Sequence, residues 1–121
     1  MPGTQLFMRK RGFTLVEIMI VVLIIGIILS IAVPQWIRAR ERSQARACVS
    51  NLRQIESAKE QHAMENNLPE GAPCAMADIW PIYIKLSTEP DCPSGGVYTV
   101  GAIGERPTCS IAAGLYPHVL P

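Results

Sequence analysis

The stretch that decides the fold is residues 9–33, which read Arg-Lys-Arg-Gly-Phe-Thr-Leu-Val-Glu-Ile-Met-Ile-Val-Val-Leu-Ile-Ile-Gly-Ile-Ile-Leu-Ser-Ile-Ala-Val. Three basic residues and a glycine precede an apolar run from Phe13 to Val33, whose only charged side chain is Glu17. A helix over these 21 residues is roughly 31 Å long, which matches a bilayer hydrocarbon core of about 30 Å. The stretch therefore predicts a membrane-spanning helix in which an acid is costly unless it is paired.

The string Gly-Phe-Thr-Leu-Val-Glu at residues 12–17 resembles the processing site of type IV pilins and type II secretion pseudopilins. The resemblance covers about residues 10–49 and is greatest to the small G-type major pseudopilins. It implies that a prepilin peptidase cuts between Gly12 and Phe13 and methylates the new amino group of Phe13. It also implies that Glu17, the fifth residue after the cut, acts in assembly, and that Pro34 is the family's proline in the apolar helix.

The physical properties of the segment agree with the roles that the resemblance implies. Within one chain the Phe13 amine and Glu17 are at i and i+4, so they can pair locally. In a staggered bundle, Glu17 of one subunit meets the Phe13 amine of its neighbour, and paired charges in an apolar core cost much less than unpaired ones. The alternative is a chance acid that snorkels to water. Pro34 lacks an N–H group, so it is expected to kink or loosen the helix near Ser30.

A secreted domain is the main alternative to a membrane helix, because Ser30-Ile31-Ala32 resembles a signal-peptidase site. The apolar run is longer than the usual 7–15 residues of a signal peptide, and Glu17 interrupts its first turn. Both features favour a retained membrane segment.

The orientation of this segment does not follow from charge, because basic residues flank it on both sides. Those that follow the span are Arg38, Arg40, Arg42 and Arg46. The positive-inside rule therefore gives no answer. The resemblance and the cysteines place the N-terminus in the cytoplasm. The chain is then a single-pass protein of the cytoplasmic (inner) membrane, and its assembled filament is periplasmic or extracellular.

Apolar residues continue at helical spacing beyond Pro34. They are Ala45, Cys48, Val49, Leu52, Ile55 and Ala58, with His62 on or beside the same stripe. This pattern predicts one long helix from about Thr14 to Asn66, ended by asparagines and by Pro69. The expected segments are a leader (1–12), a transmembrane helix (13–33), an amphipathic helix (34–67) and a small head outside the cytoplasm (68–121).

The head is expected to contain a short helical or turn segment at 77–86 and an antiparallel β-hairpin. Trp80, Ile82 and Tyr83 are core candidates, with a binding surface as the alternative. Strands are predicted at 97–100 and 108–111, joined by the loop 101–107. A two-stranded hairpin is marginal alone, so it must pack on the helix. The predicted fold class is therefore α+β and pilin-like.

The four cysteines, at positions 48, 74, 92 and 109, favour disulfides in a domain outside the cytoplasm. Hairpin closure brings Cys92 and Cys109 together, and their bond would close a loop of about 18 residues, worth about 3 kcal/mol in the chain-entropy model. Cys48 is then a buried thiol under the sheet, although a Cys48–Cys74 bond remains open. No C-x-x-C pair exists and the chain has only two histidines, so no metal site is expected.

Several classes of function are excluded by what the sequence lacks. Without residues 1–12 the chain has eight basic and ten acidic residues, so it has no basic excess for nucleic-acid binding. The acids available for a calcium loop have no Asp-x-Asp spacing, so no calcium site is expected; they are Asp78, Glu89, Asp91 and Glu105. No nucleophile–base pair, phosphate loop or His-Glu motif is present. We expect no enzyme activity and no cofactor.

The predicted function is that of a structural filament subunit that assembles through its apolar helix. The expected partners are the prepilin peptidase, copies of itself or related pilins, an inner-membrane assembly platform and the membrane. The alternatives are a membrane-anchored binding module that does not polymerise, and a minor pilin. The small head favours a secretion pseudopilus, but a type IV pilus remains open.

Overall fold

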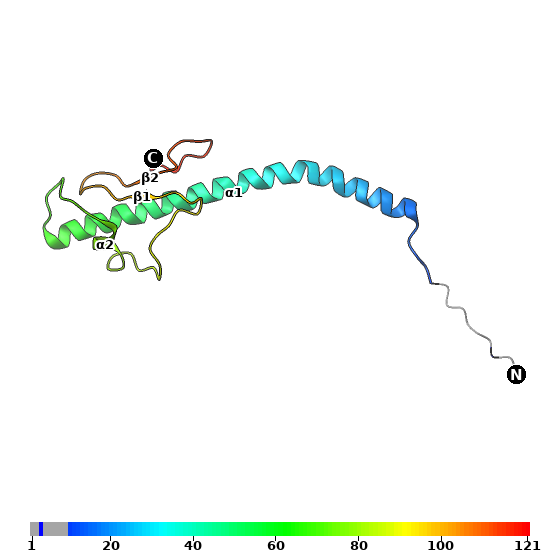
Figure 1. Ribbon diagram of the computed structural model, residues 1–121, viewed down its shortest axis with the longest axis horizontal. Helices are drawn as coiled ribbons and strands as arrows, with labels where there is room; N and C mark the ends of the chain where they lie inside the picture. Colours follow the sequence, from blue (N-terminus) through cyan, green and yellow to red (C-terminus); the bar gives the residue numbers. More distant parts are fainter. Residues whose placement is uncertain (1–2, 4–9) are drawn as a thin grey trace. The chain divides into compact units, whose positions relative to one another are not determined.

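The computed structural model of the chain describes Gly3 and residues 10–121, so most of the predicted leader lies outside the described residues. Its elements are α1 (Leu15–Asn66), α2 (Met76–Ile79), β1 (Tyr98–Thr99) and β2 (Thr108–Cys109) (Figure 1). The predicted α+β, pilin-like class is confirmed. The chain divides into two compact units, Met1–Trp36 and Ile37–Pro121.

Local capping explains where α1 begins. The hydroxyl oxygen of Thr14 accepts a hydrogen bond from the backbone N–H of Glu17 at 3.2 Å. Thr14 is therefore the N-cap, and Glu17 stands at the third helical position, the arrangement of a Thr-x-x-Glu capping box. An acid in the first turn also interacts favourably with the helix dipole.

The end of α1 has an equally local cause. Asn67 adopts a left-handed conformation with φ of 49°, and the N–H of Leu68 donates to the carbonyl of Ala63 at 2.9 Å. This is the hydrogen bond of a Schellman motif, which satisfies a carbonyl that the last turn leaves free. The predicted end at Asn66 is confirmed.

Pro34 lies inside α1, which continues through it. Its missing N–H leaves the Ser30 carbonyl without its usual helical donor. One turn earlier, the Ser30 hydroxyl donates to the carbonyl of Ile27 at 2.7 Å. The kink expected near Ser30 stays a prediction.

The core of the Ile37–Pro121 unit lies against one face of α1. The buried residues of that face are Ala45, Cys48, Leu52, Ile55, Ala58 and Lys59. Five of these were expected from the apolar spacing, whereas Val49 and His62 are only half-buried and Lys59 was not expected. Full burial of a side chain such as Leu52 or Ile55 stabilises the fold by about 1.5–3 kcal/mol.

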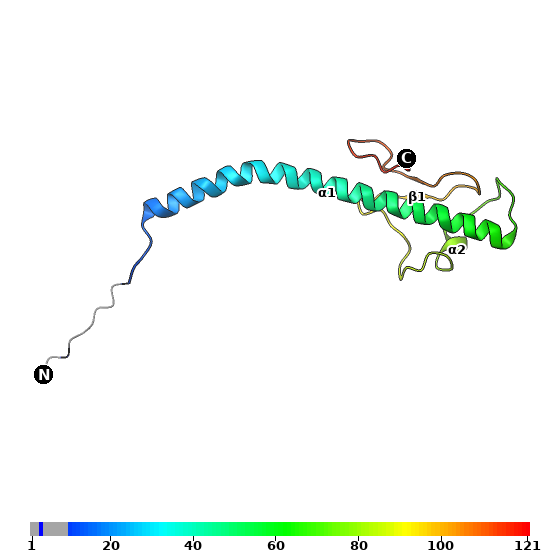
Figure 2. The same cartoon turned by 180° about the vertical axis from the view of Figure 1, so that it is seen from behind.

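Two clusters fill this core. One joins Ile55 and Ala58 of α1 to residues that follow α1 in the chain; these are Ile79, Ile84 and Val100. The other contains Leu52 and three of the cysteines, at positions 48, 92 and 109. Figures 1 and 2 show the hairpin along one side of the second half of α1, and α2 with its following loop on another.

The two strands are antiparallel, with Tyr98 opposite Cys109 and Thr99 opposite Thr108. They are shorter than predicted, but the expected loop between them is confirmed. Pairing continues for one more step through Ser110, because its N–H donates to the Val97 carbonyl at 2.9 Å and its hydroxyl accepts the Val97 N–H at 2.9 Å. The hairpin packs on α1 through Cys109 and Val100, which lie in different core clusters.

The segment after α2 differs from the expected core. The N–H groups of Tyr83 and Ile84 both donate to the Ile79 carbonyl, at 2.9 and 3.2 Å. This turn directs Ile79 and Ile84 inward, while Trp80 and Tyr83 are partly buried against them. Ile82 is 64% exposed, because it lies on the outer side of the turn. Its assignment to the core was wrong.

Candidate functional site

The amino-terminal part of α1 presents an apolar surface with no cover in the described chain. Every side chain from Phe13 to Val33 is exposed, and the exposed fraction of Phe13 is 81%. By length and composition, α1 is the one helix of the described residues that is apolar enough to cross a membrane. Such a surface requires lipid or other apolar helices around it.

The predicted processing residues Gly12 and Phe13 stand directly before α1 and are exposed. A Cβ atom placed on Gly12 would meet no heavy atom of the described residues within 4 Å. The fold around Gly12 therefore does not require a glycine.

Glu17 is one turn into the helix, and its backbone N–H is already bound by the Thr14 hydroxyl. Its side chain is exposed, and none of the described residues forms a salt bridge or side-chain hydrogen bond with its carboxylate. Gly26, further along the same segment, also has open space where a Cβ would be. The charge of Glu17 and the small size of Gly26 are thus both available to a neighbouring molecule.

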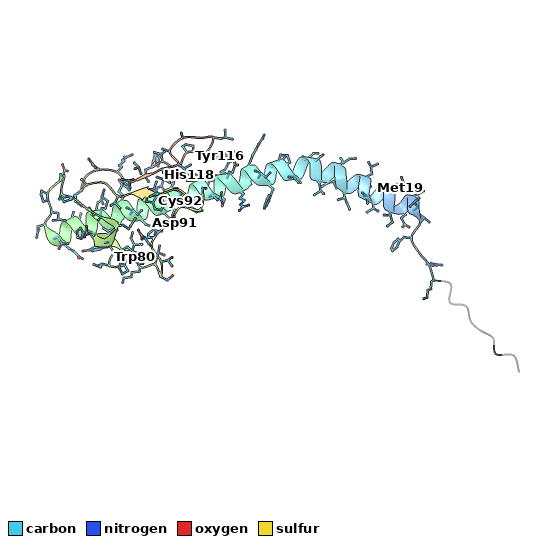
Figure 3. The ribbon with its side chains drawn as sticks, in the orientation of Figure 1. Met19, Trp80, Asp91, Cys92, Tyr116 and His118 are labelled. Carbon is cyan, nitrogen blue, oxygen red and sulfur yellow. The ribbon has the colours of Figure 1, made fainter. Side chains whose placement is uncertain are left out.

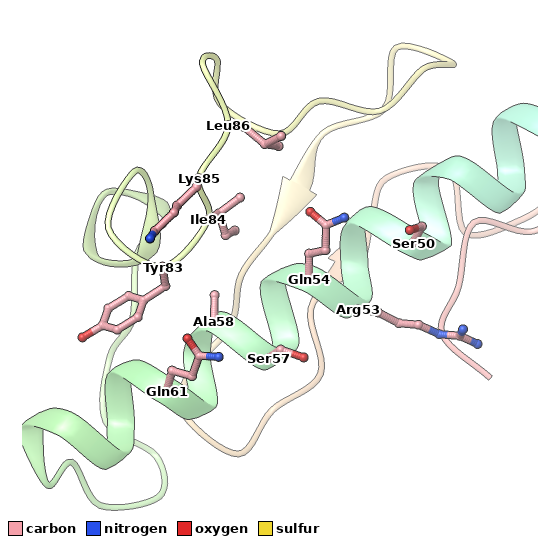
Figure 4. Close-up of a pocket in the computed structure, with 10 residues that line it drawn as sticks. All are labelled: Ser50, Arg53, Gln54, Ser57, Ala58, Gln61, Tyr83, Ile84, Lys85 and Leu86. Atoms are coloured by element: carbon pink, nitrogen blue, oxygen red, sulfur yellow. The ribbon is translucent and has the colours of Figure 1, made fainter.

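An open groove of about 400 Å³ lies between α1 and the segment Tyr83–Leu86 (Figure 4). Its α1 side is lined by Ser50, Arg53, Gln54, Ser57, Ala58 and Gln61. The lining contains no carboxylate, thiol or imidazole. It offers hydrogen bonds and positive charge to a neighbouring molecule.

The predicted head acids serve their own loops. The carboxylates of Asp78 and Asp91 accept the N–H groups of Ala75 and Cys92, both at 2.8 Å. The carboxylate of Glu105 accepts the N–H of Ala102 at 3.1 Å. These hydrogen bonds give the three acids a structural role.

A second site lies in the Ile37–Pro121 unit, where four buried side chains form what we call the thiol–imidazole cluster. Its members are Cys48, Cys92, Cys109 and His118. Their sulfur and ring nitrogen atoms all lie within 4.8 Å of one another. The Cys92 sulfur is 3.3 Å from Nδ1 of His118, and Figure 3 shows these two residues side by side.

The cluster is assembled from segments far apart in the chain. Cys48 comes from α1 and Cys109 from β2. The loop before β1 positions Cys92, whose carbonyl accepts the Gly95 N–H at 2.9 Å. His118 is fixed by its own N–H, which donates to the Ile111 carbonyl at 3.0 Å.

The thiols of the cluster have different electrostatic surroundings. Burial raises the pKa of Cys48 to about 12. Burial also acts to raise the pKa of Cys92, but hydrogen bonds from the backbone N–H groups of Ser94 and Gly96 and from the thiols of Cys48 and Cys109 together outweigh it, so that the net pKa is lowered. The Cys92 position thus favours a thiolate more than Cys48 does.

All four cysteines are free thiols in the structure. Cys92 and Cys109 lie together, as the expected hairpin closure required, and Cys48 is buried beside them. Their disulfide stays a prediction. Cys74 packs against the other core cluster, so the structure gives no support to a Cys48–Cys74 bond.

The expectation of no metal site depended on how the cysteines and histidines are spaced along the chain. The cluster brings four of them together in space, so that argument does not apply to the folded protein. His118, one of the two histidines of the chain, is 4% exposed and contacts Cys92. No short sequence motif predicts the cluster, because its members come from four separate segments. The available sequence signal was the Cys-Pro-Ser-Gly-Gly turn at residues 92–96, which presents N–H groups to a sulfur.

Comparison with known proteins identifies the class of the amino-terminal segment. The family described as the prokaryotic N-terminal methylation motif matches residues 7–33. The chain therefore carries a prokaryotic N-terminal methylation motif at the start of a long helix that is followed by a small antiparallel head.

Curated relatives include both pilins and pseudopilins. Over 59 residues the chain is 39% identical to type II secretion system core protein G of Pectobacterium carotovorum subsp. carotovorum. The matched region covers 49% of this chain and 38% of the relative. It is 42% identical to the type IV major pilin protein PilA of Myxococcus xanthus, over 49% of this chain and 27% of the relative. A fimbrial protein of Pseudomonas aeruginosa is 43% identical over 46% of this chain and 36% of its own length.

Over about half of its length, the chain is thus similar to type IV pilin and type II secretion pseudopilin sequences. The matched segment spans less than half the length of these relatives. No solved structure matches the chain.

Proposed function

We propose that the chain is a structural subunit of a filament, either a type IV pilus or a type II secretion pseudopilus. It is made as a prepilin, cut between Gly12 and Phe13 and methylated on the Phe13 amine by a prepilin peptidase. It then waits in the cytoplasmic membrane and enters the filament through residues 13–33. An inner-membrane assembly platform supplies the subunits, and the head lies outside the cytoplasm.

The observation that carries this proposal is the uncovered apolar surface of residues 13–33, which lies within the segment that matches the methylation motif. Transfer from lipid to a helix bundle exchanges one apolar surrounding for another, so packing and polar contacts decide the association. Glu17 and Gly26 supply those contacts. Among the described residues, nothing pairs with the carboxylate of Glu17 and nothing fills the open side of Gly26.

In this proposal the carboxylate of Glu17 pairs with the methylated Phe13 amine of a neighbouring subunit and sets the register between helices. The capping role is separate from the pairing role, because the cap uses the Glu17 backbone N–H and the Thr14 hydroxyl. Glutamine at position 17 keeps the side-chain oxygen of a capping box but removes the charge. It therefore separates the two roles.

Processing is tested by intact-mass and N-terminal analysis of the chain purified from a host with a prepilin peptidase. The expected mature N-terminus is N-methylated Phe13. An unprocessed chain, or one starting at Val33 after cleavage at a signal-peptidase site, would contradict the proposal. Gly12→Ala is expected to block the cut if the peptidase requires glycine at this position. It should leave the fold intact, because nothing around Gly12 is in the way of an added Cβ.

Assembly is tested with Glu17→Gln in the full chain, expressed with its cognate assembly machinery. We expect normal membrane insertion and loss of filaments in sheared fractions. Glu60→Ala, which removes another exposed acid of α1, is the matched control and should assemble. If Glu17→Gln assembles like the wild type, Glu17 does not set register; if the wild type never enters filaments, the chain is a membrane-anchored binding module.

A further inference from the structure

We propose that the thiol–imidazole cluster is a structural zinc site that closes the head of the protein. The proposal is independent of filament assembly. It depends only on four side chains that the fold brings together and buries.

The donor set is the first argument. Three thiols and one imidazole make up one of the ligand combinations of structural zinc sites, which are four-coordinate and closed to solvent. All four residues are buried, with exposed fractions between 0% and 4%. A buried site that supplies four protein ligands suits a structural ion more than a catalytic one, which keeps a position open for water or substrate.

Geometry is the second argument. A tetrahedral zinc with Zn–S distances of about 2.3 Å holds its sulfur ligands about 3.8 Å apart. The ligand atoms of the cluster lie within 4.8 Å of one another, and the Cys92 sulfur is 3.3 Å from Nδ1 of His118. Side-chain shifts of about 1 Å or less at a site of this size bring the four atoms to coordination distance.

The surroundings of the sulfurs are the third argument. The N–H groups of Ser94 and Gly96 face the Cys92 sulfur, and the Tyr98 hydroxyl lies within hydrogen-bonding reach of Cys48. Donors of this kind support metal-bound thiolates and orient them. A Cβ on Gly96 would stand 2.6 Å from the Cys109 sulfur and 3.2 Å from that of Cys92. Glycine at this position leaves the space that the sulfurs occupy.

A disulfide explains the cluster less completely. A Cys92–Cys109 bond uses two of the three thiols, and leaves Cys48 and His118 buried beside it without a role. Zinc uses all four groups and links α1, the loop before β1, β2 and the carboxyl-terminal segment. Such a link suits a head whose sheet has only two short strands, because a sheet of that size is marginal alone.

The first test measures metal in the full chain, purified in detergent without chelator or reductant. We expect about one zinc per chain by elemental mass spectrometry. After reduction and metal removal, Co²⁺ added alone should give the sulfur-to-cobalt charge-transfer band and the intense d–d bands of a tetrahedral thiolate site. Both measurements use the wild type, so a misfolded variant does not affect them.

The second test removes single ligands. Cys92→Ala and His118→Ala are each expected to lower retained zinc at least about tenfold. The matched controls are Cys74→Ala and His62→Ala, which remove a thiol and an imidazole outside the cluster and should retain the metal. Circular dichroism of each variant reports whether α1 is intact.

The same preparations distinguish zinc from the disulfide. A chain without metal, whose mass is lower by the hydrogens lost in a Cys92–Cys109 bond, would overturn the proposal. A reduced wild-type chain that takes up neither Zn²⁺ nor Co²⁺ would also overturn it. So would zinc that survives both ligand substitutions.

Discussion

The Nζ atom of Lys59 lies 2.6 Å from the carbonyl oxygen of Val100, in the interior of the head. The same ammonium group donates to the carbonyl of Glu105 at 2.7 Å. Lys59 is only 3% exposed, although lysine is among the residues least often buried. Its two hydrogen bonds hold both ends of the hairpin loop against α1.

Lys59→Met should therefore destabilise the head. The substitution keeps a long side chain but leaves the buried carbonyl of Val100 and the part-buried carbonyl of Glu105 without their donor. The expected cost is about 1–3 kcal/mol in the free energy of unfolding. Urea unfolding of the detergent-solubilised chain, followed by tryptophan fluorescence, measures this change. Lys85→Met, at an exposed position, is the control and should change stability little. Equal stability of both variants would remove the anchoring role of Lys59.

Lys59 also predicts a pH dependence. Burial lowers its pKa below the ordinary 10.5, against smaller opposing effects of Cys74, Glu105 and Glu56. Between the lowered pKa and 10.5 the unfolded chain binds more protons at this site than the folded chain does. The contribution of Lys59 to stability therefore rises with pH through that window.

The measurement is the free energy of unfolding against pH for the wild type and Lys59→Met. Their difference isolates Lys59 from other groups that titrate nearby, such as Cys74, whose pKa is raised by burial. We expect the destabilisation by Lys59→Met to grow as pH rises through the window. A difference that is constant with pH would show that the pKa of Lys59 is not lowered.

Gly96→Ala tests the close packing around the sulfurs. The added methyl group would overlap the Cys109 sulfur at 2.6 Å and crowd Ile111 at 3.1 Å. Overpacking of this kind typically costs about 1–3 kcal/mol, and it should also reduce metal retention. Ser94→Ala, an exposed change in the same loop, keeps the backbone N–H and should do neither. Wild-type stability in Gly96→Ala would mean that the loop can move to accommodate the added methyl group at little cost in free energy.

The parts of this fold that were predictable from sequence have local causes. The apolar run, the Asn67 cap and Pro69 mark the long helix within a residue or so, because each acts on its own neighbours. The burial of Lys59 was not predictable in this way. Its acceptors lie about forty residues further along the chain, so no window of sequence around Lys59 contains the reason.

The same difference between local causes and contacts of distant residues separates the two candidate sites. Gly12, Phe13 and Glu17 belong to one short string, so the string predicts a role for all three. The thiol–imidazole cluster is assembled by tertiary packing, and its histidine is in a segment with no helical or strand period. Ile82 shows the opposite error, because a large apolar side chain was assigned to the core although the turn after α2 faces it outward.

Thr14→Ala tests the cap that starts α1. Loss of the hydroxyl removes the acceptor for the Glu17 N–H, and such caps are worth about 1 kcal/mol. Amide hydrogen exchange in detergent micelles should show faster exchange at Glu17 and in the first turn, while the amides after Pro34 stay unchanged. Thr14→Ser keeps an acceptor and is the matched control. Unchanged exchange in Thr14→Ala would mean that the surrounding apolar phase, and not the cap, fixes the start of the helix. Glu17 would then keep its position without Thr14.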